Sequence, residues 1–86
     1  MVYVHGTRWC IWCTRAIRLL ERRGIPYQFI DVGGDREARA ALRAKTGRTT
    51  VPQIWIGERW IGGCTDLEAL DDRGELDHLT GEQVSR

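Results

Sequence analysis

The chain has 86 residues, of which 42% are hydrophobic and 29% charged, and its formal net charge is +1 at pH 7. This length supports one domain with one modest core, and the near-neutral charge gives no argument for nucleic-acid binding. No apolar run approaches the roughly 20 residues of a membrane span, and the first residues lack the pattern of a signal peptide, so we expect a cytoplasmic protein.

The first part of the chain predicts a strand, a helix and a second strand. Residues 2–5 alternate as a β-strand does, and a helix follows from about residue 11 to 23, which Gly24 ends and Pro26 cannot continue. Residues 27–32 are apolar at nearly every position, which predicts a strand covered on both faces in a parallel arrangement. The apolar stripe of the helix consists of Cys13, Ala16, Ile17 and Leu20.

The middle of the chain predicts a short charged helix and a hairpin. Asp35 can cap a helix that runs to Lys45 before a glycine. Residues 51–56 and 59–61 predict two strands, joined by a two-residue turn that begins with Gly57.

A last helix completes the order β-α-β-α-β-β-α. Thr65 and Glu68 have the spacing of a capping box, so we expect this helix to start at Thr65, with a further turn after Gly74. We therefore predict one α/β domain over residues 1–80 and a polar tail over residues 81–86.

Cys10 and Cys13 form the one C-x-x-C spacing in the chain. The pair lies where the apolar stripe of the first helix begins, so unpaired N–H groups and the positive end of the helix dipole favour a thiolate at Cys10. Arg8 and Arg15 are nearby positive charges. Cys13, three residues on and deeper in the helix, is within reach of a disulfide to Cys10. Cys10 is the expected nucleophile and Cys13 the expected resolving cysteine.

Half of a zinc site is the alternative interpretation of this cysteine pair. A structural zinc ion needs four ligands, and the chain otherwise offers Cys64, His5 and His78, without a second short ligand pair. We therefore expect no metal here. Structural disulfides are not expected either, because cytoplasmic thiols are kept reduced.

Three motifs occur in order along the chain: C-I-W-C at 10–13, T-V-P at 50–52 and G-G-C-T-D at 62–66. With them the chain resembles a dithiol glutaredoxin of bacterial type over nearly its whole length. The resemblance implies a thioredoxin fold, an α/β structure with a four-stranded mixed sheet flanked by three helices. It also implies a monomeric thiol-disulfide oxidoreductase with glutathione as reductant and co-substrate. The implied substrates are glutathionylated or disulfide-containing proteins, and neither a nucleic acid nor a membrane is an expected partner.

The resemblance further implies that glutathione binds beside the thiols like an added strand. The Val51–Pro52 bond is then cis, and Val51 offers backbone groups to an extended peptide, although a proline that merely starts an edge strand is the alternative. Thr65 and Asp66 match positions that hold the γ-glutamyl end, with helix capping as their alternative role. Arg39 matches a position that reaches the glycyl carboxylate, or is a solvent-exposed arginine. The full implied glutathione-binding set is Arg8, Trp12, Arg39, Thr50, Val51, Pro52, Gly63, Cys64, Thr65 and Asp66.

Two departures from the family pattern leave other functions open. Thr7 stands where the family usually has a lysine, so Arg8 must supply that cation, and Trp12 replaces a tyrosine in a motif that also lacks its proline. Thr7 with Trp9 resembles mycoredoxins, which serve another low-molecular-weight thiol. The second alternative is an iron–sulfur cluster carrier, in which Cys10 thiolates of two chains and glutathione hold the cluster.

The remaining distinctive side chains receive no chemistry from the sequence. Cys64 fits a small buried residue before the last helix, with a regulatory or glutathionylated thiol as the alternative. His5 fits a packed or solvent-facing ring, and Trp55 and Trp60 fit packing on the sheet.

Overall fold

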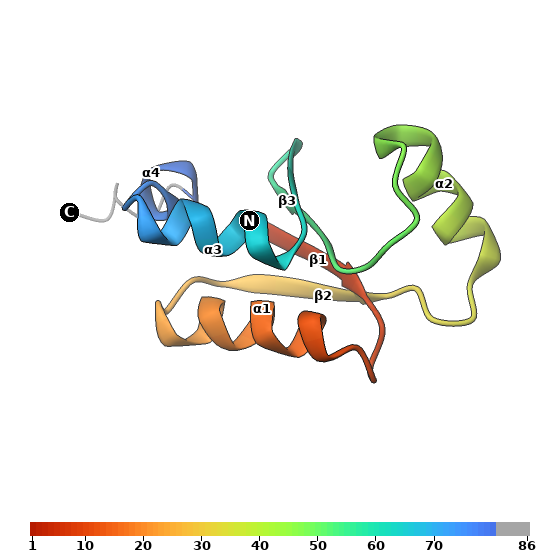
Figure 1. Ribbon diagram of the computed structural model, residues 1–86, viewed down its shortest axis with the longest axis horizontal. Helices are drawn as coiled ribbons and strands as arrows, with labels where there is room; N and C mark the ends of the chain where they lie inside the picture. Colours follow the sequence, from red (N-terminus) through yellow and green to blue (C-terminus); the bar gives the residue numbers. More distant parts are fainter. Residues whose placement is uncertain (81–86) are drawn as a thin grey trace.

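A computed structural model of the protein describes residues 1–80. Within these residues, four strands form one sheet and four helices accompany it (Figure 1). The elements are β1 (Val2–Gly6), α1 (Ile11–Arg22), β2 (Tyr27–Asp31), α2 (Arg36–Thr46), β3 (Gln53–Ile56), β4 (Arg59–Gly62), α3 (Cys64–Asp72) and α4 (Leu76–Thr80). The predicted order is confirmed, and the turn expected after Gly74 is a separate fourth helix rather than part of a third. The predicted tail, residues 81–86, lies outside the described residues.

The sheet joins a parallel pair of strands to an antiparallel hairpin. Its strand order is β2-β1-β3-β4, with β1 parallel to β2 and antiparallel to β3. The hairpin between β3 and β4 turns at Gly57, whose φ of +62° suits a residue without a Cβ. The four-stranded mixed sheet of the thioredoxin fold is therefore confirmed.

The prediction that β2 is covered on both faces is wrong. β2 lies at the edge of the sheet, and each of its residues is half-buried or exposed. The apolar side chains of β2 lie on its two faces in different environments. Phe29 packs against the core, whereas Ile30 lines a hollow between the sheet and α2. This open hollow leaves the second face of β2 without a covering helix.

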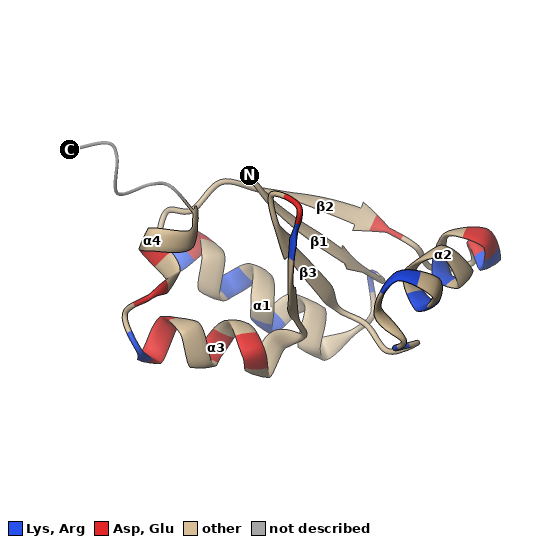
Figure 2. Cartoon of the chain, turned by 90° about the horizontal axis from the view of Figure 1, so that it is seen from above, with Lys and Arg blue, Asp and Glu red and all other residues tan. Residues whose placement is uncertain are grey.

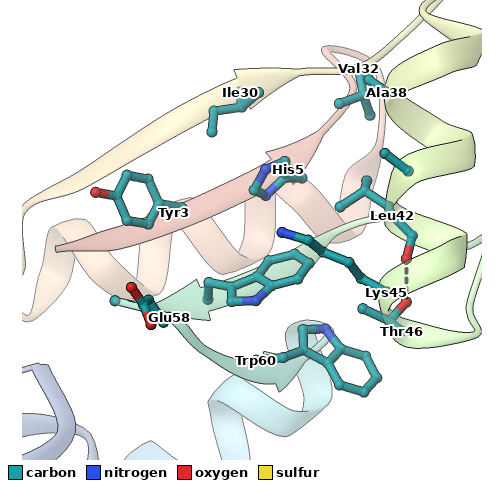
Figure 3. Close-up of a pocket in the computed structure, with 13 residues that line it drawn as sticks. Tyr3, His5, Ile30, Val32, Ala38, Leu42, Lys45, Thr46, Glu58 and Trp60 are labelled. Atoms are coloured by element: carbon teal, nitrogen blue, oxygen red, sulfur yellow. Dashed lines mark hydrogen bonds between the residues drawn. The ribbon is translucent and has the colours of Figure 1, made fainter.

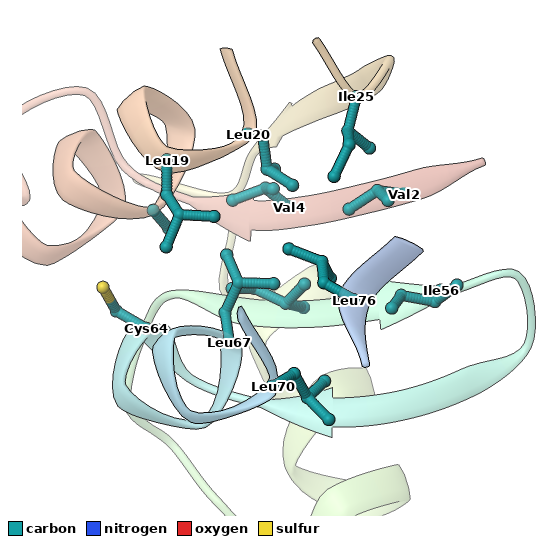
Figure 4. Close-up of a cluster of buried hydrophobic side chains, with 12 residues drawn as sticks. Val2, Val4, Leu19, Leu20, Ile25, Ile56, Cys64, Leu67, Leu70 and Leu76 are labelled. Carbon is teal, nitrogen blue, oxygen red and sulfur yellow. The ribbon is translucent and has the colours of Figure 1, made fainter. Parts of the chain in front are cut away.

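The core lies between one face of the sheet and the helices α1 and α3 (Figure 4). Val2 and Val4 enter it from β1, and Leu20 of α1 and Leu67 of α3 meet them, all with no exposed surface. Burying one such side chain stabilises the fold by about 1.5 to 3 kcal/mol relative to leaving it in water. The core therefore fixes α1 and α3 side by side on this face.

The buried stripe of α1 is wider than predicted. Cys13, Ala16 and Leu20 are buried as expected, whereas Ile17 is partly buried and Leu19 is buried in addition. The wider stripe follows from the position of α1, which packs against α3 as well as against β1.

Helix α2 lies apart from α1 and α3, at the far end of the sheet, and carries many charged residues (Figures 1 and 2). The Asp35 carboxylate accepts a hydrogen bond from the Ala38 N–H at 3.0 Å and so caps the helix as predicted. Gly47, with φ of +79°, ends it. Leu42 is its buried residue, so α2 is attached to the sheet by a small apolar contact.

Candidate active site

Cys10 occupies the N-cap position of α1, where the sequence placed it. Its Sγ accepts a hydrogen bond from the Cys13 N–H at 3.2 Å, and its thiol lies 3.8 Å from the Val51 carbonyl oxygen. Cys10 is a half-buried residue and is thus not enclosed by the fold, unlike Cys13 and Cys64. The sulfur therefore lies at the open first turn of the helix, where a thiolate that attacks a disulfide would face backbone N–H groups.

Cys13 lies one turn deeper and has a different environment. Its side chain is 1% exposed, and burial, with the hydrogen bond to Cys10 as the next cause, raises the pKa of its thiol from 9.0 to about 12. Gly6 at the end of β1 makes room for this sulfur, because a Cβ at Gly6 would overlap the Cys13 Sγ. The structure thus separates an accessible thiol from a buried, protonated one.

Apolar side chains stand in solvent on both sides of Cys10. Trp9 is 93% exposed, Ile11 75% and Trp12 46%. The Trp12 ring is held from one side by Arg15, whose guanidinium carbon lies 5.2 Å from the ring centroid. Arg15 in turn forms a two-point ion pair with Glu68 of α3. Sequence reasoning treated Arg15 only as a nearby charge, since its partner lies far along the chain.

The loop before β3 brings a backbone carbonyl to the thiols. The Val51–Pro52 peptide bond is cis, as the resemblance implied. The sheet pairing of β3 with β1 begins at Gln53, so Val51 lies outside this ladder. Its carbonyl faces the Cys10 sulfur. The Thr50–Pro52 segment and the cysteine pair are therefore brought together.

The Gln53 side chain holds this loop in place by hydrogen bonds, a role that the sequence analysis did not predict. Its side chain is 1% exposed, and its Nε2 donates to the carbonyls of Arg48 at 2.9 Å and Thr50 at 3.1 Å. Its Oε1 accepts from the Thr46 hydroxyl at 3.0 Å. A polar amide in an otherwise apolar strand was the available signal.

The start of α3 differs from the prediction by one residue. The helix begins at Cys64, with Gly63 as N-cap, so Thr65 is not its first residue. The Asp66 Oδ2 accepts from the Gly63 N–H at 2.8 Å, which is the reciprocal bond that had been assigned to Glu68. Gly62, with φ of +122°, lies against the same carboxylate, and a Cβ there would overlap it. Gly63 also approaches Pro52, so this end of α3 borders the thiol site.

Two of the implied glutathione-binding arginines have other partners here. The Arg8 Nε lies 3.7 Å from the Asp31 carboxylate, with 76% of the Arg8 side chain exposed. The Arg39 guanidinium donates to the Thr49 carbonyl at 3.2 Å. The structure thus places both at the edge of the site rather than on the cysteine pair. A third arginine, Arg48, was missed, and it lies 3.9 Å from the Asp66 carboxylate.

Cys64 is buried, with 4% of its surface exposed, which agrees with a packing role. Burial, followed by the negative charge of Glu68, raises the pKa of its thiol from 9.0 to about 11. Among residues 1–80, no group of three or more His, Cys, Asp or Glu side chains is arranged to hold a metal ion. None of the helices formed by these residues is long and apolar enough to cross a membrane.

Comparisons with known proteins agree with this geometry. The family model described as Glutaredoxin matches residues 1–61. The chain is 53% identical over 78 residues to a glutaredoxin of Pseudomonas aeruginosa, covering 91% of this chain and 93% of the relative. It is 44% identical over 78 residues to glutaredoxin 3 of Escherichia coli K12, covering 91% and 94%. The crystal structure of a buckwheat glutaredoxin–glutathione complex has a TM-score of 0.87 and 31% identity, covering 94% of this chain and 76% of that one. The chain therefore belongs to the glutaredoxin family of thiol-disulfide oxidoreductases.

Proposed function

We propose that the protein is a glutathione-dependent oxidoreductase that reduces protein–glutathione mixed disulfides and protein disulfides. The observation that carries this proposal is the position of the Cys10 sulfur at the N-cap of α1, accessible and beside the Val51 carbonyl. An extended peptide that pairs with the backbone of Val51 would bring its own sulfur to Cys10. Glutathione is such a peptide, and the buckwheat relative is described in complex with it.

Mixed disulfides need only the first thiol. The Cys10 thiolate attacks the glutathione sulfur of the mixed disulfide, the S–S bond breaks, and the protein leaves as a thiolate that takes up a proton. The product is a disulfide between Cys10 and glutathione. A second glutathione thiolate attacks the glutathione sulfur of that disulfide, which returns Cys10 as a thiolate and releases oxidised glutathione.

Protein disulfides need both thiols. Cys10 attacks one substrate sulfur and forms a mixed disulfide, and Cys13 then loses its proton and attacks the Cys10 sulfur. The substrate leaves as a dithiol, and two glutathione molecules reduce the Cys10–Cys13 disulfide. Because burial holds the pKa of Cys13 at about 12, Cys13 does not compete with Cys10 for the first attack.

The proposed glutathione site runs between the start of α3 and the arginines at the edge of the site. The N–H groups at the start of α3 take the γ-glutamyl carboxylate, and Asp66 takes the ammonium. Both contacts of the Asp66 carboxylate with Gly63 and Arg48 use Oδ2, so Oδ1 is the oxygen for this ammonium. Arg8 exchanges Asp31 for the glycyl carboxylate at small cost, because its present ion pair is long and exposed.

Protein substrates would meet an apolar surface around the nucleophile. Trp9, Ile11 and Trp12 are exposed large hydrophobic side chains that flank Cys10 in the chain. Exposed apolar groups gathered at one place are typical of a protein contact surface.

We propose that the protein acts as a monomer in the cytoplasm, with residues 1–80 as its catalytic domain.

Turnover of a glutathionylated peptide by glutathione and glutathione reductase tests the proposal. Cys10→Ser should abolish turnover, whereas Cys13→Ser should retain it and lose most of the reduction of protein disulfides. Equal loss in both variants with the glutathionylated peptide would contradict the division of labour. Turnover that needs a mycothiol-type reductant would favour the mycoredoxin-like alternative, and visible absorbance after anaerobic reconstitution would favour the cluster carrier.

A further inference from the structure

A hollow of about 870 Å³ lies on the face of the sheet opposite the core, between the strands and α2 (Figure 3). Tyr3 and His5 alternate along β1 with the buried valines of the core, so they point into this hollow. Neither Cys10 nor Cys13 lines it. Its volume falls in the range of about 300 to 1,000 Å³ that is typical of small-molecule sites.

Aromatic rings form much of the floor. The ring centroids of His5 and Trp55 are 5.0 Å apart with planes at 66°, and those of Trp55 and Trp60 are 6.5 Å apart at 44°. None of these contacts is a parallel stack, so a flat ring can still pack against an indole face. The Arg48 guanidinium, which is not among the lining groups, lies 5.2 Å from the Trp60 ring centroid.

Two polar atoms on this floor are buried without a hydrogen-bond partner among residues 1–80. They are His5 Nδ1 and Trp60 Nε1, and both residues line the hollow. Nearly all buried polar atoms in folded proteins have a partner, so two unpaired atoms in residues that line one hollow leave its floor incompletely hydrogen-bonded. Each atom has less than 1 Å² of exposed surface, so a ligand reaches it only when the ring turns. The indole N–H can only donate, so a ligand that pairs with Trp60 must present an acceptor to it.

The charged residues around the hollow indicate the charge of the ligand and its orientation. Lys45, the one lysine in the chain, reaches from α2 toward His5, whereas Glu58 lies at the end nearer Tyr3 (Figure 3). Within the described part of the chain, neither Lys45 nor Glu58 forms an ion pair or a side-chain hydrogen bond. An anionic group would therefore lie toward Lys45 and away from Glu58.

We propose that this hollow binds a small planar aromatic anion. Its ring packs on Trp55 and Trp60, and its negative charge lies against the Lys45 ammonium. A turn of the Trp60 ring then brings Nε1 to an acceptor atom of the ligand. The inference does not depend on the proposed glutathione chemistry, because the hollow and the thiols are lined by different residues.

The four tryptophans make the test direct, because each contributes one indole N–H signal to a proton–nitrogen spectrum. Trp9 and Trp12 lie beside Cys10, and Trp55 and Trp60 lie in the hollow. Titration with 2-naphthoate should shift the Trp55 and Trp60 signals to saturation, with the Trp60 proton moving downfield as its N–H gains an acceptor. Single tryptophan-to-phenylalanine variants assign the four signals.

Matched probes and variants distinguish the contribution of the aromatic ring to binding from that of the negative charge. Lys45→Gln should raise the Kd of 2-naphthoate about five- to tenfold and leave the Kd of uncharged 2-naphthylmethanol unchanged. Arg43→Gln, the same loss of charge elsewhere on α2, should change neither, and Glu58→Gln should not weaken 2-naphthoate. Each expected result supports the site.

Three results would overturn the inference. Shifts confined to Trp9 and Trp12 would place the aromatic anion at the thiols instead. No saturable shift of Trp55 or Trp60 at millimolar 2-naphthoate would mean that the hollow binds no such ligand. Equal affinity for the charged and uncharged probes, with Lys45→Gln silent, would show that charge plays no part.

Discussion

Gly6 of β1 leaves the space that the Cys13 sulfur of α1 occupies, because a Cβ at Gly6 would overlap this sulfur. The Phe29 ring lies 3.3 Å from the same point, so an added methyl group could not turn aside. A glycine at the end of β1 therefore leaves the space in which the Cys13 sulfur is buried.

Gly6→Ala should destabilise the protein, because the methyl group must displace the Cys13 sulfur or the first turn of α1. Overpacking of this kind costs about 1 to 3 kcal/mol in the free energy of unfolding, which urea titration measures. Gly33→Ala is the control, since its closest neighbour is the exposed Asp31 Oδ1 at 3.1 Å. This oxygen also accepts the Gly33 N–H bond, so moving it costs at most one exposed hydrogen bond rather than a clash with the core. The loss of unfolding free energy caused by Gly6→Ala should be smaller in a Cys13→Ala background, where the sulfur is absent. An equal loss in both backgrounds would mean that the methyl group does not clash with the sulfur.

Stability should fall with rising pH above about 9 because of the two buried thiols. Burial raises the pKa of Cys13 to about 12 and that of Cys64 to about 11, from 9.0. Below pH 9 these thiols are protonated in both states, so their contribution to stability is fully present. Above it they ionise first in the unfolded chain, and the contribution is lost as the pH rises toward 11 and 12.

Urea unfolding in reductant between pH 7 and 10.5 measures this decline. Cys13→Ser should flatten it, because serine does not ionise in this range. The hydrogen bond to Glu21 also raises the pKa of Tyr27, so the difference between variants, rather than the slope itself, isolates the thiol. A variant with the same slope as the parent would contradict the assignment to Cys13.

Asp66→Asn tests the proposed ammonium contact of glutathione. The amide oxygen can still accept the Gly63 N–H bond, so stability should fall by only about 0.3 to 1 kcal/mol, through loss of a charge at a helix start. Loss of a charge-assisted bond to substrate should lower kcat/KM for a glutathionylated peptide about 10- to 100-fold. The rate at which Cys10 reacts with a small alkylating agent should not change.

Asp72→Asn supplies the control for this variant, since it makes the same change at the exposed far end of α3. Arg39→Ala should act in the same direction as Asp66→Asn but by less, because Arg39 now bonds a carbonyl at the edge of the site. A specificity constant that is indifferent to Asp66 would remove the ammonium contact from the proposed site.

Gln53→Met should destabilise the loop that carries Val51. The substitution keeps the volume of the side chain but leaves the carbonyls of Arg48 and Thr50 without their donor. We expect a loss of about 1 to 3 kcal/mol in the free energy of unfolding and a higher KM for glutathionylated substrates. Gln28→Met, in an exposed position of β2, should stay within about 0.5 kcal/mol of the parent; equal losses in both variants would contradict this role of Gln53.

The parts of the fold that could be predicted are those whose signals are local. Asp35 and Gly47 mark the two ends of α2 through a side-chain cap and a left-handed residue, and both act within a few residues of the helix. The start of α3 could not be decided this way. Thr65 with Glu68 and Gly63 with Asp66 have the same three-residue spacing, and the choice depends on where β4 ends.

The parts of the site that were missed depend on contacts between distant segments. Arg15 and Glu68 lie on different helices, and their ion pair exists because the core packs α1 against α3. The fit of Gly6 to Cys13 likewise appears only once β1 and α1 are in contact. Local periodicity placed the cysteine pair at a helix start, but it carries no information on such neighbours.

The bonds of Gln53 and Thr46 have a consequence for moving this loop between proteins. Thr46 ends α2, Gln53 begins β3, and their side chains close a ring of hydrogen bonds around the residues between them. The shape of the loop is thus encoded within one short stretch of sequence. A graft of residues 46–53 onto another sheet of the same strand order should carry its carbonyls in their native arrangement, whereas a graft of residues 48–52 alone would leave two of them without donors.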